Sequence, residues 1–240
     1  MWPEAPTFAL FWENSKLNPR TGEAFARDLE RDARTAAPAA QLLFPSEDLR
    51  LPRPTDALAD LMRSRVSRRE LGPRPLSERQ LGALFHAFSE TDSWHRMVPS
   101  AGGKYPVEVF AFLFRVEGAL AGRAVYYNSD HHSLSAVGAC PPWAEARGAL
   151  GMTAELSPAA MFAFVGWPGR VLRKYGERGG RFLLIEVGHY AQNLGLRVAA
   201  EKLAGYEVGG LHDDRVRALL GLEGSDAAVA LGYAVGAPLA

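Results

Sequence analysis

A run of basic and hydroxyl residues, Arg65-Val66-Ser67-Arg68-Arg69, has residue types that could hold an anion. If this segment is extended, Arg65, Ser67 and Arg69 project to the same side, because side chains alternate along an extended chain. Two guanidinium groups and a hydroxyl on one side would suit a phosphate monoester, whose oxygens accept bidentate hydrogen bonds. An exposed basic helix end, where cations complement the helix dipole, explains the same residues. Taken alone, the segment favours the exposed helix end.

A second segment, Pro99-Ser100-Ala101-Gly102-Gly103, lies between a basic residue and a strongly apolar run. Its small residues would let the backbone approach a flat ligand closely, and Ser100 adds a polar contact. A tight loop without a ligand is the plain alternative.

A third segment, Arg173 to Arg181, is dense in charge and interrupted by glycines. Such segments are usually solvated surface loops, and we expect a loop here. Its adjacent Lys174 and Tyr175 could instead form an acid–base pair, because a neighbouring ammonium group favours the phenolate form of tyrosine.

Composition excludes several classes of function. Lys plus Arg (27) equals Asp plus Glu (27), so no overall field favours nucleic acid or an anionic membrane. The single cysteine, Cys140, rules out an internal disulfide, as expected in a reducing compartment. No signal-peptide pattern, membrane-spanning apolar run or metal-ligand spacing is present, so we expect a cytoplasmic protein without a metal site.

The apolar pattern predicts the elements that position these segments. Thr55 is expected to cap a helix over 56–63, and Ser77 with Gln80 forms a capping box for the next helix. Apolar runs predict strands over residues 107–116, 124–127, 159–167 and 226–235. The longest predicted helix, 181–202, has no charged residue between Val187 and Leu196, which indicates burial in the core or against a second subunit.

This irregular alternation of helices and strands predicts an α+β fold, a mixed α/β sandwich, rather than a regular βαβ array. No GxGxxG motif follows a strand, so a Rossmann dinucleotide site is not indicated. Residues 1–54 are less regular and are expected to be an N-terminal extension of a main domain over 55–240.

Read together, the segments resemble the SagB-type dehydrogenase branch of the FMN-dependent nitroreductase superfamily. Five blocks occur in the order that this branch shows. They are the N-terminal segment 11–16, the R-x-S-x-R segment at 65–71, the PSAG-x-YP motif at 96–106, one block that joins the KYG segment (173–181) to GH-x-x-QNL (188–194), and a late glycine segment at 209–214.

The resemblance implies a nitroreductase-like fold, with a central, mainly antiparallel sheet flanked by helices, and a homodimer that binds FMN at its subunit interface. Carried over by position, Arg65, Ser67 and Arg69 would hold the FMN phosphate and ribityl end. The flavin ring would lie against Ser100 and Gly102 and against the backbone of Gly209 and Gly210. Gln192 and Asn193 are weaker candidates, because helix packing also explains both of them.

The branch oxidises peptide azolines to azoles, and its Lys-Tyr pair corresponds to Lys174 and Tyr175. Aromatisation needs a base for a carbon-bound proton and a hydride acceptor, here flavin N5. A peptide-cyclising enzyme would be a separate partner. One departure is Gly179-Gly180, where the family often has a larger residue, which could loosen the segment carrying Lys174.

Two other functions fit the same resemblance. A general NAD(P)H-dependent nitro or quinone reductase needs no Rossmann unit, because a nicotinamide can stack on the flavin. A non-catalytic flavin-binding or scaffolding subunit could use residues 1–54 to dock a partner.

Overall fold

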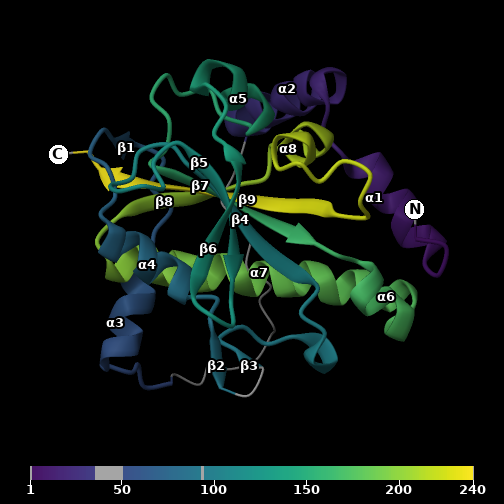
Figure 1. Cartoon of the computed structure of the whole chain (residues 1–240), viewed down its shortest axis with the longest axis horizontal. Coiled ribbons are helices and arrows are strands. Elements are labelled where there is room, and N and C mark those ends of the chain that lie inside the picture. Colours follow the sequence, from purple (N-terminus) through teal and green to yellow (C-terminus); the bar gives the residue numbers. More distant parts are fainter. Residues whose placement is uncertain (1, 36–50, 93–94, 240) are drawn as a thin grey trace.

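A computed structural model describes residues 2–35, 51–92 and 95–239 (Figure 1); part of the expected N-terminal extension, 36–50, lies outside the described residues. In chain order the elements are α1 (Pro6–Ser15), α2 (Pro19–Thr35), α3 (Ala57–Ser64), β1 (Leu71–Gly72), α4 (Glu78–His86), β2 (Glu90–Asp92), β3 (His95–Arg96), the 3-10 turn η1 (Ala101–Gly103), β4 (Val107–Leu113), β5 (Arg123–Asn128), β6 (Ser133–Ala139), α5 (Trp143–Ala149), β7 (Ala160–Gly166), α6 (Gly169–Tyr175), α7 (Glu177–Ala200), β8 (Ala204–Val208), α8 (Asp213–Leu219) and β9 (Ala228–Pro238).

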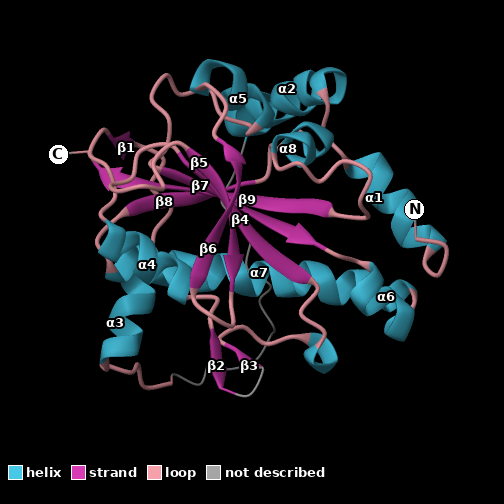
Figure 2. Cartoon of the chain, viewed as in Figure 1, coloured by secondary structure: helices cyan, strands magenta, loops and turns pink. Residues whose placement is uncertain are grey.

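The centre of the molecule is a seven-stranded sheet in the order β1-β9-β7-β4-β5-β6, with β8 also paired to β9 (Figure 2). Every pairing within it is antiparallel. Helices cover both faces, with α7 running across one face and α5 and α8 lying over the other (Figure 1). The predicted α+β fold with a mainly antiparallel central sheet is therefore confirmed.

Strands β4 and β7 are buried along their whole length, which explains their continuous apolar sequences. Their side chains alternate between two cores. Val109 and Phe162 pack with Tyr190 of α7, whereas Phe112 and Met161 pack in the second core, beneath α5 and α8. The sheet thus separates two apolar layers, and α7 is held by the first.

The helix signals in the sequence were largely confirmed. The Ser77–Gln80 capping box opens α4. The cap of α3, however, is Asp56 and not Thr55, because the Asp56 carboxylate accepts a hydrogen bond from the Ala59 amide at 2.8 Å. Helix α7 begins four residues earlier than predicted, at Glu177, directly after Gly176 with its positive φ of 53°.

Helix α7 is not buried all round within one chain. Leu183, Val187 and Tyr190 face the sheet, but Leu184 is 39% and Ile185 55% exposed on the opposite side. The sequence left open whether this helix is buried in the core or against a second subunit, and for the face with Leu184 and Ile185 burial in the core is wrong. The exposed apolar face is available to a second subunit.

The start of the chain is more ordered than the sequence suggested. Trp2, Phe8 and Trp12 form a third apolar cluster with Leu172 of α6. The Glu177 carboxylate accepts hydrogen bonds from the Thr7 and Phe8 amides, both at 2.8 Å. Helix α1 is therefore joined to the corner between α6 and α7. In the part of the chain that the structure describes, no helix is both long and apolar enough to cross a membrane.

Candidate functional site

The basic segment after α3 is extended and lies along β8. Arg65 ends α3, and the Arg68 amide donates a hydrogen bond to the Gly205 carbonyl at 3.0 Å. Ser67 and Arg69 line a pocket of about 440 Å³, together with Arg68, Glu70 and the chain after β9. The stem of Arg65 instead packs beside Gly195 of α7. The structure thus brings Ser67 and Arg69 to one pocket and places Arg65 next to it, against α7.

The late glycine segment meets Arg69 in an adjoining pocket of about 530 Å³. Gly209, Gly210 and Arg69 all line it, as does Tyr206. The Arg69 guanidinium lies 5.8 Å from the centre of the Tyr206 ring. Because Arg69 borders both pockets, the basic segment and the glycine segment form one continuous surface, which we call the phosphate-end half-site.

A second group of predicted residues meets at the other end of α7. Gly102 has a left-handed φ of 61°, and a Cβ at this position would collide with the Tyr175 hydroxyl and lie 2.7 Å from Lys174 Nζ. The left-handed backbone therefore favours glycine here, and a larger residue would also have to displace the ends of the Tyr175 and Lys174 side chains. Ser100, Gly102, Lys174 and Tyr175 form what we call the Lys-Tyr half-site.

Lys174 and Tyr175 lie in the last turn of α6 and not in a loop, so that expectation was wrong. The preference for a loop rested on charge density and glycines, but only Gly176 breaks the helix, and Gly179 and Gly180 lie inside α7. Lys174 is exposed, with its Nζ 5.0 Å from the centre of the half-buried Tyr175 ring. The ammonium group therefore lies within cation–π distance of the Tyr175 ring.

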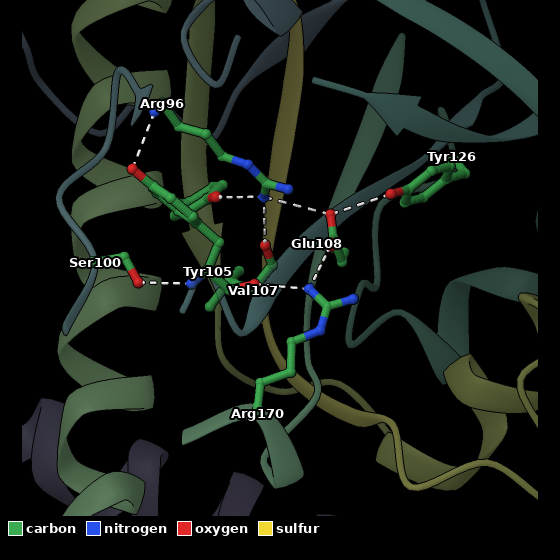
Figure 3. Close-up of polar contacts among 8 residues, drawn as sticks. Arg96, Ser100, Tyr105, Val107, Glu108, Tyr126 and Arg170 are labelled. Carbon is green, nitrogen blue, oxygen red and sulfur yellow. Dashed lines mark hydrogen bonds and ion pairs between the residues drawn. The ribbon is translucent and has the colours of Figure 1, made fainter. Parts of the chain in front are cut away.

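A polar network behind this half-site fixes the Ser100 loop (Figure 3). The Ser100 hydroxyl accepts a hydrogen bond from the Tyr105 amide at 2.8 Å, and the Tyr105 hydroxyl accepts one from the Arg96 amide at 3.1 Å. The Arg96 guanidinium donates to the Val107 carbonyl at 3.2 Å and to the Tyr190 hydroxyl at 3.1 Å. The loop is thus tied to β4 and to α7.

Glu108 of β4 is the anion at the centre of this network. Its buried carboxylate pairs with Arg96 at 3.4 Å and with Arg170, and it accepts a hydrogen bond from Tyr126 at 3.2 Å (Figure 3). Burial, reinforced by Glu108, raises the pKa of Tyr126 to about 12. The sequence analysis missed Glu108, although an acid within an apolar strand was a usable signal.

Glu186 of α7 is a second buried acid that the sequence analysis missed. It is 2% exposed, and among the described residues no group meets strict hydrogen-bond geometry with its carboxyl oxygens, although Ser100 and the Val107 amide lie close to them. Burial raises its pKa to about 7, and Ser100, the Val107 amide and Arg96 reduce that rise without cancelling it. The carboxyl is therefore close to half-protonated at neutral pH.

The two weaker candidates on α7 differ in their surroundings. Gln192 is exposed. The Asn193 amide donates to the Met97 carbonyl at 2.9 Å and to the Ala87 carbonyl at 3.4 Å. Asn193 thus links α7 to the segment that leads into the Ser100 loop, which is a packing role.

Within one chain the two half-sites do not meet. The Lys-Tyr half-site lies beside the start of α7, whereas Arg65 packs against Gly195. Eighteen residues of helix, at about 1.5 Å each, separate Glu177 from Gly195 by about 27 Å.

With this geometry described, the chain can be compared with known proteins. The model of the nitroreductase family matches residues 62–237, which is most of the chain and includes both half-sites. The chain belongs to the nitroreductase family.

Similar proteins agree with this assignment. A nitroreductase-family protein of Methanocaldococcus jannaschii, MJ1384, is 32% identical over 166 residues, covering 68% of this chain and 83% of the relative. A solved nitroreductase-family protein of Ralstonia eutropha has a TM-score of 0.65 at 22% identity, covering 79% of this chain and 89% of its own. A chain of the Escherichia coli microcin synthetase complex McbBCD, solved with truncated pro-MccB17 bound, has a TM-score of 0.70 at 22% identity, covering 95% and 96%. The two solved structures share the fold of this nitroreductase-family chain.

Proposed function

We propose that this nitroreductase-family chain is an FMN-dependent oxidoreductase, with residues 55–240 as its flavin-binding domain. The continuity of the phosphate-end half-site carries the proposal. Ser67 and Arg69 offer a hydroxyl and a guanidinium at one end, and Gly209 and Gly210 offer bare backbone at the other. This arrangement fits a ligand with an anionic tail and a flat ring.

We further propose a homodimer in which each flavin lies between the phosphate-end half-site of one copy and the Lys-Tyr half-site of the other. The exposed face of α7, which includes Leu184, Ile185 and Gly188, lies midway between the two half-sites. An antiparallel, two-fold pairing of α7 helices about this face would bring opposite ends of the two copies together. It would also cover two apolar side chains that one chain leaves in water.

The finer proposal is a SagB-type dehydrogenase that oxidises an azoline ring of a peptide to an azole. Bound FMN would supply the hydride acceptor. Lys174 would stabilise the Tyr175 phenolate, whose oxygen would accept the carbon-bound proton, so that one proton and one hydride leave the ring. The placement of both residues against Gly102 supports this role. The azoline-bearing peptide would come from a separate cyclising enzyme.

The cofactor proposal is tested by the affinity for FMN, measured by fluorescence titration. We expect the double variant Arg65→Ala/Arg69→Ala to bind FMN about tenfold or more weakly, because charge-assisted hydrogen bonds to the phosphate are lost. The control Arg74→Ala/Arg79→Ala removes the same charge from exposed positions and should bind normally. Wild-type affinity in the first variant, or no FMN uptake by the wild type, would refute the proposal.

The branch assignment is tested with the flavin-loaded protein and an azoline model peptide. Aromatisation that is lost in Lys174→Ala supports a SagB-type dehydrogenase. Rapid bleaching of the flavin by NADPH, followed by reoxidation with a nitroaromatic but no aromatisation, would identify a general reductase instead. A flavin spectrum that neither reductant nor substrate changes would identify a non-catalytic subunit.

A further inference from the structure

Helix α2 presents an apolar stripe to the 530 Å³ pocket that borders the phosphate-end half-site. Gly22, Phe25, Ala26 and Leu29 are spaced three and four residues apart, and all of them line this pocket. The family match begins at residue 62, so this wall of the pocket lies outside it.

The beginning of α2 is fixed to α8. The Leu17 amide donates to the Asp213 carboxylate at 3.2 Å, and Lys16 pairs with Asp214 at 3.2 Å. A Cβ added at Gly22 would lie 3.1 Å from the His212 ring, so the first turn sits close against this residue. These contacts fix which face of α2 is turned toward the pocket.

The large apolar side chains of the stripe are only partly covered by the residues that the structure describes. Phe25 is 41% and Leu29 56% exposed, although both line the pocket. The opposite wall contains Tyr206, Gly209 and Gly210. The pocket is thus apolar on the α2 side, whereas its other side combines the glycine backbone with the charged side chains of Arg69 and Glu207. Its volume lies within the usual range of small-molecule sites, roughly 300–1,000 Å³.

We propose that Phe25 and Leu29 bind the ring of the substrate, so that α2 determines which substrates this enzyme accepts. The ligand class is a flat ring, because an aromatic and an aliphatic side chain face a glycine backbone across the pocket. Burial and the neighbouring Arg215 lower the pKa of His212, so this residue adds no charge at neutral pH. The inference rests on the proposed flavin site at Gly209 and Gly210, and assigns the space beside it.

The test uses flavin-loaded protein with menadione, an uncharged quinone, as the probe and electron acceptor, and NADPH as the electron donor for turnover. We expect Phe25→Ala/Leu29→Ala to raise the KM for menadione, and its Kd for the oxidised holoprotein measured by calorimetry, about tenfold or more. The Kd for FMN should stay at the wild-type value. The control Arg27→Ala shortens a side chain on the opposite face of α2 and should leave all three constants unchanged.

Three results would overturn the inference. Unchanged menadione constants in the double variant would show that α2 does not bind the ring. A parallel loss of FMN affinity would assign the stripe to the cofactor. A wild-type chain that takes up no FMN would refute the proposed function and, with it, this inference. This outcome can be told apart from the other two, because the wild type itself would then lack flavin before any variant is made.

Discussion

The substitution Glu186→Gln is expected to change how the stability of the protein depends on pH. In the folded chain the carboxyl is buried, and this burial raises its pKa from 4.5 to about 7. A raised acid pKa stabilises the fold fully below the unfolded value and loses that contribution as pH rises through the folded value. Between pH 5 and pH 8 the wild type should lose about 2.5 kcal/mol of unfolding free energy through this one group. Glutamine has no proton to lose and should lose none of it.

The assay is urea unfolding of the wild type and of Glu186→Gln at pH 5, 6, 7 and 8. The difference between the two free energies of unfolding removes the contribution of every other titrating group. We expect this difference to move in favour of the variant by about 2.5 kcal/mol across the series. In thermal unfolding the same change is about 5–10 °C in Tm.

The control is Glu223→Gln, which removes an exposed carboxyl, and its difference from the wild type should be flat with pH. A flat difference for Glu186→Gln as well would mean that the buried carboxyl has found a partner or water. A trend of opposite sign would mean that it is held ionised. Either result refutes the reasoning.

Two further predictions concern packing and charge. Gly180→Ala should lower the unfolding free energy by about 1–3 kcal/mol, since the added methyl would collide with the Phe8 ring, whereas Gly82→Ala, with open space around it, should raise it by about 0.5–1 kcal/mol. Equal effects in urea unfolding would contradict the docking of α1. Glu108→Leu should lower the unfolding free energy by about 3 kcal/mol, because Arg96 and Arg170 lose the carboxylate that they pair with. A loss below about 1 kcal/mol would mean that both guanidinium groups reach water.

Fully buried strands could be predicted from the sequence, and exposed ones could not. β4 and β7 are covered on both faces, so their apolar runs are unmistakable. The exposed strand β6 mixes small, polar and apolar residues, and no alternation of polar and apolar residues indicated a strand there. β8 is only five residues long, and its strand conformation depends on pairing with β9. Whether β6 and β8 form strands depends on their pairing with other strands, and the local sequence pattern carries no information about that pairing.

The sequence named candidate site residues but not how they are arranged in space. The PSAG-x-YP motif named Gly102, the KYG block named Lys174 and Tyr175, and the structure places these three side by side. Nothing in their spacing indicated that Arg65 would lie at the far end of α7. Glu108 and Glu186 were each visible as a lone acid among apolar residues, but their surroundings come from segments distant in the chain.

The central position of β9 also bears on when the protein could acquire its cofactor. Among the described strands, β1 and β8 pair only with β9, which leaves the ribosome after both of them. A nascent chain that has not yet released β9 can join β4, β5, β6 and β7 but has no place for β8. The extended segment of Ser67 and Arg69 is hydrogen-bonded to β8. Loading of the proposed phosphate-bearing cofactor at this segment would therefore have to wait until β9 has left the ribosome and docked.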